Sequence, residues 1–242
     1  MREIAEKIKN AECVIALTGA GISTESGIPD FRSKNGLWSR YDMEEYGYIH
    51  NLMENPAKVW EMFADMIKNF GNAEPNAAHF ALAEMEKMGW LDAIITQNVD
   101  SLHSMAGSQK VIELHGNMKQ FYCMECGRSY NYERIDMNSL PPRCDCGGVI
   151  RPNVILFGED LPKDALLKAF YYASKCDVII VAGTSCMVYP AAELPWMVKN
   201  RGGIIIEINE DDTGITHIAD YILRGKVGSI LSKLLKEIKN LP

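Results

Sequence analysis

Short apolar, β-branched runs alternate along this chain with longer segments whose apolar residues recur at helical spacing. Most of the apolar runs are bounded by Gly, Asn or Ser, which predicts buried parallel strands. These runs are Val14 to Leu17, Ala93 to Thr96, Val111 to Leu114, Asp177 to Ala182 and Ile204 to Ile208. The predicted helices are Pro56 to Phe70, Asn76 to Met88, Lys163 to Ala173, Tyr189 to Asn200 and Val227 to Asn240. Such alternation predicts an α/β fold with a doubly wound, Rossmann-like parallel sheet.

Two segments interrupt the alternation and predict insertions. Residues 117–151 contain Pro-Pro and Gly-Gly pairs and four cysteines, which is typical of a small module without regular helices. Residues 34–72 are rich in Met, Trp and Tyr and predict a helical insertion. The remaining residues, 1–33, 73–116 and 152–242, are then expected to form the Rossmann-like domain.

The amino-acid composition limits which classes of partner the protein is expected to bind. The chain has 242 residues, of which 47% are hydrophobic, enough for one sizeable domain with a small insertion. A net charge of -7 argues against direct binding to nucleic acid, which needs clustered Lys and Arg. No apolar stretch is long enough to span a membrane, and the start MREIAEKIKNAE predicts a charged amphipathic helix. We therefore expect a cytoplasmic protein without a membrane partner, and a monomer.

Two close cysteine pairs predict a metal site in the inserted module. Cys123 and Cys126 are separated by two residues, Cys144 and Cys146 by one, and glycines follow both pairs. Four thiolates suit tetrahedral Zn²⁺ and leave no position for a water ligand. The sequence therefore predicts one structural zinc ion. Two reduced cysteine pairs without a metal are the alternative.

The segment TGAGISTESGIPDFR, residues 18–32, directly follows the first predicted strand and indicates a nucleotide site. Gly19 and Gly21 would let the backbone turn tightly and approach a pyrophosphate at the start of a helix expected around residues 22–26. A Gly-x-Gly turn by itself is more often an ordinary turn, and this one lacks a third glycine. The acid, aromatic ring and guanidinium of Asp30 to Arg32 could fold over a bound ligand.

Polar residues follow two further predicted strands. Gln97, Asn98 and Asp100 lie after one strand, and His115 lies after another with Gly116 beside it. Carboxyl ends of parallel strands form the ligand edge of such a sheet, where amides and an acid can bind a ribose or a carboxamide. A histidine there can accept a proton from a ribose hydroxyl. Standing alone, it would more often cap a strand or pack in the core.

The order of the motifs TGAGIS, GIPDFR, TQNVD, HG, paired cysteines, RPNVILFGE, GTS and IN resembles the sirtuins, from about Thr18 to Leu231. Sirtuins are NAD-dependent protein lysine deacylases. The resemblance implies removal of acetyl groups from lysine side chains of proteins or peptides, with release of nicotinamide and O-acetyl-ADP-ribose. It implies NAD as co-substrate and one structural Zn²⁺ per chain.

The resemblance also implies roles for individual residues. His115 matches the base and Asn98 a catalytic polar group. The implied cofactor-binding residues are Ala20, Thr24, Phe31, Arg32, Gln97, Val99, Asp100, His115, Thr184, Ser185, Asn209 and Val227. Val154, Ile155 and Phe157 would line the acyl-lysine tunnel, although their pattern alone predicts an ordinary buried strand. Judged alone, Thr184 and Ser185 indicate a helix cap and Asn209 a turn.

The sequence leaves alternatives open for the acyl group that is removed and for the class of reaction. Relatives that prefer succinyl or malonyl lysine have a Tyr and an Arg three residues apart, where this chain has Phe63 and Met66. Neither can pair with a carboxylate, so we expect acetyl-lysine to be preferred. The other readings are ADP-ribosyl transfer to protein, a nonenzymatic NAD-sensing module and, least favoured, a dehydrogenase. The apolar wall from Val154 to Phe157 favours acyl-lysine.

Overall fold

A six-stranded parallel sheet is the centre of the larger lobe in the computed structural model, which describes residues 1–242. The strand order is β3-β2-β1-β7-β8-β9. The strands are β1 (Val14–Thr18), β2 (Ala93–Thr96), β3 (Val111–Glu113), β7 (Val178–Ala182), β8 (Ile204–Asn209) and β9 (Tyr221–Arg224). The order reverses between β1 and β7, and ligands of open parallel sheets bind at such a reversal.

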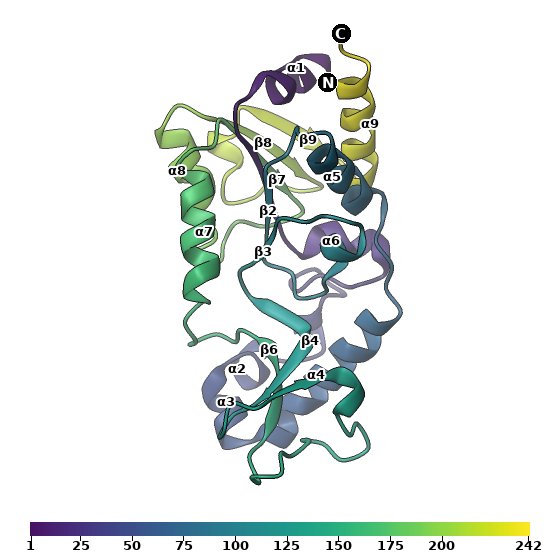
Figure 1. The fold of residues 1–242 in the computed structure, drawn as a ribbon, viewed down its shortest axis with the longest axis vertical. Helices are drawn as coiled ribbons and strands as arrows, with labels where there is room; N and C mark the ends of the chain where they lie inside the picture. The colour runs from purple at the N-terminus through teal and green to yellow at the C-terminus, as the bar shows by residue number, and fades with distance from the viewer.

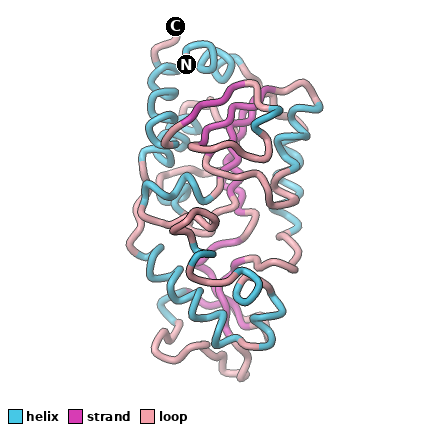
Figure 2. Tube along the Cα trace, turned by 180° about the vertical axis from the view of Figure 1, so that it is seen from behind, coloured by secondary structure: helices cyan, strands magenta, loops and turns pink.

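Helices cover both faces of this sheet, as Figure 2 shows from behind. Val14 and Ala16 of β1 pack toward one group of helices, and Ile15 and Leu17 toward the other, because strand side chains alternate between faces. One face carries α1 (Arg2–Asn10), α5 (Ala77–Lys87) and α9 (Val227–Lys239). The other carries α7 (Lys163–Ala173) and α8 (Glu193–Asn200). The expected doubly wound α/β architecture is confirmed.

The smaller lobe lies at the other end of the long axis from the chain termini (Figure 1). It contains an antiparallel sheet in the order β5-β4-β6 and the helices of the predicted helical insertion. Its elements are β4 (Gly116–Cys123), β5 (Ser129–Asn131), β6 (Ile150–Val154), α2 (Met43–Tyr46), α3 (Ile49–Glu54) and α4 (Pro56–Gly71). A further short helix, α6 (Leu102–Met105), lies in the larger lobe.

The two predicted insertions pack against each other in one hydrophobic core, called here the shared core. Trp60 and Phe63 of α4 meet Phe121 of β4 and Ile150 of β6 in it. The Trp60 ring lies 6.4 Å from that of Phe121, and its Nε1 donates to the Ile150 carbonyl at 3.0 Å. Segments that are separate in sequence therefore form a single lobe.

Several local expectations differ from the structure. The helix expected around residues 22–26 is a seven-residue 3₁₀ helix, Ala20–Ser26, and it ends where Gly27 turns left-handed at φ 83°. The expected helix from Tyr189 begins only at Glu193, since Pro190 disfavours helical backbone in the residue before it. The strand suggested by the run from Val154 to Phe157 ends at Val154. No helix has the length and apolar character needed to cross a membrane.

Candidate active site and metal centre

A cleft of about 1830 Å³, including the part open to solvent, lies between the strand ends of the larger lobe and the smaller lobe. Its walls come from the loops after β1, β2, β7 and β8 on one side and from α4 and the segment after β6 on the other. The predicted site residues that line it are Ala20, Phe31, Arg32, Gln97, Asn98, Val99, His115, Val154, Ile155, Phe157, Thr184, Ser185 and Asn209. The structure thus gathers most of them in one place.

A smaller pocket of about 420 Å³, including the part open to solvent, adjoins this cleft. Ala20, Phe31, Asn98 and Val99 line both spaces. Asp100 lines only the smaller pocket, together with apolar residues of the first loop and of α4. The site therefore consists of a long cleft and a side pocket that carries the buried acid.

Two predicted cofactor-binding residues lie outside the lining of these spaces. The exposed Thr24 donates from its Oγ1 to the Gly21 carbonyl at 2.9 Å, within its own 3₁₀ turn. Val227 is the first residue of α9, and its side chain is buried against the parallel sheet. Their roles as cofactor-binding residues remain predictions.

The glycines of the first loop allow two strand-end loops to touch. The Gly21 amide donates to the Gly183 carbonyl at 2.8 Å. A Cβ at Gly21 would lie 2.9 Å from the Gly183 Cα, and one at Gly19 would lie 2.7 Å from the Thr184 Cβ. Gly183 itself has φ +61°, which favours glycine. The Gly-x-Gly turn therefore serves the contact between the loops after β1 and β7.

A buried hydrogen-bond chain positions the acid in the side pocket. Asn98 Nδ2 donates to Ser23 Oγ at 3.0 Å, and Ser23 Oγ donates to Asp100 Oδ2 at 2.7 Å. The Leu102 amide donates to the other carboxylate oxygen at 2.9 Å. Burial raises the pKa of Asp100, while these hydrogen bonds oppose the rise. Ser23 was missed by the sequence analysis, because nothing local distinguishes it from the other serine and threonine of this segment.

His115 presents a basic nitrogen in the cleft. Its Nδ1 lies 3.0 Å from the Gln97 carbonyl oxygen. A carbonyl can only accept, so Nδ1 carries the proton of the neutral ring and Nε2 keeps its lone pair. Burial lowers the pKa of His115 from its ordinary value of 6.5, and the bond to Gln97 opposes this shift. The imidazole is therefore neutral at pH 7 and able to accept a proton.

Hydrogen bonds link the remaining polar residues around the loop after β7. Gln97 Nε2 donates to Thr184 Oγ1 at 2.9 Å, and Asn209 Nδ2 donates to the Thr184 carbonyl at 3.4 Å. Arg32 Nη1 lies 3.4 Å from Ser185 Oγ, which ties the first loop to the same place. These contacts bring donors from four separate segments to one end of the cleft, where a phosphate or ribose could accept them.

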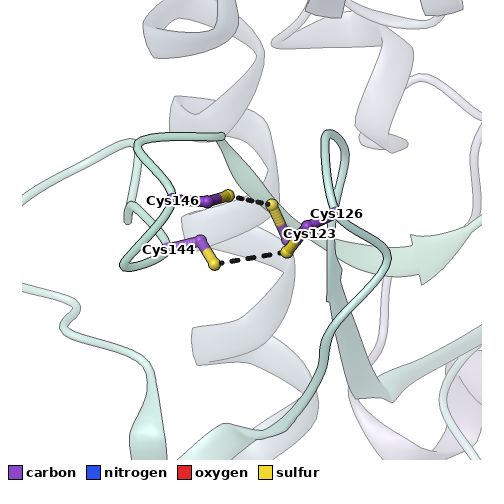
Figure 3. A group of neighbouring side chains, drawn as sticks. All are labelled: Cys123, Cys126, Cys144 and Cys146. Atoms are coloured by element: carbon purple, nitrogen blue, oxygen red, sulfur yellow. Dashed lines mark hydrogen bonds between the residues drawn. The ribbon is translucent and has the colours of Figure 1, made fainter.

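The four cysteines of the smaller lobe converge from two loops, as Figure 3 shows. The Sγ atoms of Cys123 and Cys146 are 3.5 Å apart, and those of Cys126 and Cys144 are 3.6 Å apart. All four lie within 4.8 Å of one another. Tetrahedral zinc with sulfur ligands at about 2.3 Å places the sulfurs about 3.8 Å apart. The cysteines are therefore positioned to bind a zinc ion, despite the single residue between the second pair.

The surroundings of Cys144 favour its thiolate, and those of Cys123 leave room for its sulfur. The Cys146 backbone amide and the Tyr130 hydroxyl, which donates to Cys144 Sγ at 2.9 Å, lower the pKa of Cys144 to about 6. A Cβ at Gly148 would lie 2.7 Å from Cys123 Sγ, so only glycine leaves room for the sulfur there. Donor type, spacing and space agree with a structural metal site.

Comparison with known proteins decides the family. The Sir2 family model matches residues 19–190. The chain belongs to the Sir2 family. It is 48% identical to NAD-dependent protein deacylase 1 of Archaeoglobus fulgidus, over 98% of this chain and 97% of that protein. It is 49% identical to an NAD-dependent protein deacylase of Pyrococcus furiosus, over 99% and 98%.

Solved Sir2 structures share this fold. A Sir2 homologue in complex with NAD superposes with a TM-score of 0.93 at 48% identity, covering 99% of this chain and 94% of that one. An ADP-ribose complex of a Sir2 homologue gives 0.94 at 47% identity, covering 98% and 96%. The resemblance inferred from the motifs is thereby confirmed. The roles of individual residues and the domain boundaries stay predictions.

Removing the metal should destabilise the smaller lobe, because Cys123 and Cys144 belong to the shared core. A strong zinc chelator should lower the melting temperature by on the order of 10 °C, measured by calorimetry alongside metal content. Cys126→Ser should reproduce the loss of zinc. Cys13→Ser, which lies outside the module, should keep one zinc per chain. An unchanged metal content in Cys126→Ser would contradict the assignment.

Proposed function

We propose that this chain removes acetyl groups from protein lysine side chains in an NAD-dependent reaction that releases nicotinamide and O-acetyl-ADP-ribose. The observation that carries the proposal is the placement of His115. Its unprotonated Nε2 belongs to the same cleft as the strand-end donors and the apolar segment after β6. A base is needed to take the proton from a ribose hydroxyl when the acyl group is transferred to that hydroxyl, and it is not needed for NAD binding alone. Curated relatives named NAD-dependent protein deacetylase support the same activity.

The strand-end residues are proposed to hold NAD, which supplies an activated ribose carbon as acceptor of the acyl oxygen. Asn98 and Asp100 would bind the nicotinamide carboxamide in the side pocket, with Val99 beside them. Phe31 lines both spaces and would cover the nicotinamide side of the ribose. The other residues proposed to contact the NAD molecule are Ala20, Thr24, Arg32, Gln97, Thr184, Ser185, Asn209 and Val227.

His115 would then remove the proton from a ribose hydroxyl. Its Nδ1–H bond to the Gln97 carbonyl stabilises the positive charge that develops on the ring. The side chain is largely withdrawn from water, which strengthens that interaction.

We further propose that residues 1–33, 73–116 and 152–242 form the NAD-binding domain, residues 34–72 a helical insertion and residues 117–151 the zinc module.

The proposed partners are proteins or peptides that carry acetyl-lysine. A solved Sir2 structure with a deacetylated peptide and 3′-O-acetyl ADP-ribose, at a TM-score of 0.91 and 39% identity, supports this class of substrate. Val154, Ile155 and Phe157 would line the tunnel for the acyl-lysine. We also propose a cytoplasmic monomer that binds neither nucleic acid nor membranes directly. The net charge of -7 supports the absence of nucleic-acid binding.

Mass spectrometry of an acetyl-lysine peptide incubated with the purified protein tests the function. With NAD, the deacetylated peptide and O-acetyl-ADP-ribose should appear together, and without NAD neither should. Release of nicotinamide while the acetyl group stays on the peptide would instead indicate ADP-ribosyl transfer or NAD hydrolysis. Absence of any reaction would favour another acyl group or a binding module.

His115→Ala should lower kcat for deacetylation by about 10²–10⁴ while NAD binding, measured by calorimetry, stays unchanged. In the wild type, kcat/KM should fall only below pH 6.5, because the lowered pKa keeps the base neutral above that value and protonation removes it below. His217→Ala, an exposed histidine outside the cleft, should keep the wild-type profile. A fall in the kcat/KM of the wild type on the acid side that is centred well above pH 6.5 would contradict the assignment of His115 as the base.

Acetyl-lysine should be turned over faster than succinyl-lysine. Phe63 and Met66 line the cleft and are 0% and 5% exposed, so a succinyl carboxylate there would be buried without a partner. That cost is about 3 kcal/mol, or about a hundredfold in kcat/KM for matched peptides. The double variant Phe63→Tyr, Met66→Arg should reduce or reverse the preference for the acetylated over the succinylated peptide. Faster turnover of the succinylated peptide by the wild type would overturn the prediction.

A further inference from the structure

Two cysteines outside the metal module lie beside each other at the amino ends of neighbouring strands. Cys13 directly precedes β1, and Cys176 is separated by Asp177 alone from β7, the strand that pairs with β1. The Asp177 amide donates to the Cys13 carbonyl at 2.9 Å. A backbone hydrogen bond of this kind places the Cα atoms of Cys13 and Cys176 on the order of 6 Å apart. That separation falls within the range of about 4.4–6.8 Å that a disulfide requires.

The two side chains share one environment. Cys176 belongs to the hydrophobic core between the parallel sheet and helices α7 and α8, and Cys13 packs against the same core. The Cys176 thiol donates to the Val178 carbonyl at 2.9 Å, and a side-chain hydrogen bond links it to Cys13. A bond between the two sulfurs therefore requires no rearrangement of the strands.

Hydrogen bonds fix the backbone on both sides of Cys13. Its amide and the Glu12 amide donate to Asp177 Oδ2 at 3.0 and 2.9 Å. Its carbonyl accepts from the Asp177 and Val178 amides at 2.9 and 3.3 Å. The close approach of the two cysteines is therefore a property of the folded backbone, and a disulfide between them would keep it.

The two thiols differ in exposure and acidity. Cys13 is half-buried, whereas Cys176 is 3% exposed. The hydrogen bond with Cys176 lowers the pKa of Cys13, while burial and two nearby carboxylates oppose this shift. The hydrogen bond with Cys13 and burial raise the pKa of Cys176. Reactive thiols are accessible and biased toward the thiolate, so Cys13 is the sulfur that an oxidant meets first.

We propose that Cys13 and Cys176 are a redox pair that a peroxide converts into a disulfide joining β1 to β7. Attack of the Cys13 thiolate on hydrogen peroxide forms an S–O bond, breaks the O–O bond and releases hydroxide. Attack of the Cys176 sulfur on the oxidised Cys13 sulfur then forms the S–S bond and breaks the S–O bond, which releases a second hydroxide. The two thiol protons convert both hydroxides to water, and two electrons pass from the sulfurs to the peroxide.

The disulfide would staple the fold at a distance from the active site. It closes a loop that contains the whole smaller lobe together with β2, β3 and α7, and a long closed loop restricts the unfolded chain strongly. The five residues of β1, at about 3.3 Å each, separate Cys13 from the loop at the cleft by roughly 16 Å. We therefore expect oxidation to raise stability and to leave NAD binding unchanged.

Peptide mapping by mass spectrometry tests whether the bond forms. The reduced, zinc-loaded protein is treated with hydrogen peroxide, the remaining thiols are blocked, and the digest is searched for a peptide that links Cys13 to Cys176. We expect this linked peptide in the wild type. Absence of the linked peptide from the peroxide-treated wild type would overturn the inference.

Two variants test the assignment of the sulfurs. Cys186→Ser is the matched control, because Cys186 is also buried, and burial is the main cause that raises the pKa of its thiol to about 12. It should form the same linked peptide as the wild type. Cys176→Ser should stop at a sulfenic acid on Cys13, which dimedone traps. A Cys13 that stays unmodified in Cys176→Ser would contradict its role as the sulfur that reacts first.

Calorimetry tests the consequence for stability without requiring turnover, so it is independent of the proposed function. The linked wild type should melt about 5 °C above the reduced wild type at equal zinc content. Cys13→Ser should show no such rise, and the affinity of the wild type for NAD should change less than about twofold on oxidation. Equal melting temperatures for the linked and reduced wild type, or a rise that persists in Cys13→Ser, would contradict the stapling role.

Discussion

The chain leaves the parallel sheet for the smaller lobe at His115, and the cleft depends on the hydrogen bonds made there. The ring of His115 donates to the Gln97 carbonyl in the larger lobe, and its backbone carbonyl accepts from Ile155 in the smaller lobe. Gly116 approaches Asn153 so closely that a Cβ would lie 1.9 Å from its carbonyl oxygen. One short segment therefore sets the tautomer of the His115 ring, the direction of β4 and the separation of the two cleft walls.

The smaller lobe shows how two insertions become one wall of the cleft. Trp60 and Phe63 of α4 pack with residues of β4 and β6, and Cys123 and Cys144, which are positioned to bind zinc, belong to the same shared core. Phe63 also lines the cleft. The candidate metal site and the part of the cleft lined by Phe63 are thus coupled through packing, since close-packed interiors transmit displacements.

Much of the fold could be predicted because apolar runs report buried parallel strands directly. The edge strand β9 escaped prediction, since Tyr221 to Arg224 form only a short run whose residues alternate between half-buried and exposed positions. β4 was missed for the same reason, as its exposed Lys119 and Gln120 interrupt the apolar pattern. Ser23 could not be identified either, because its link to Asp100 joins residues 77 positions apart.

By itself, the sequence determined which residues end the buried strands and which donors the metal module offers. Strand period and cysteine spacing are local properties, and parallel strands bring their carboxyl ends to one edge. Only the tertiary structure decided that Nε2 of His115 is the basic nitrogen, that Asp100 is buried and that Arg151 forms an ion pair with Glu159. Each of these depends on burial and on hydrogen-bond geometry set by the packed fold, and no local pattern of residues encodes either.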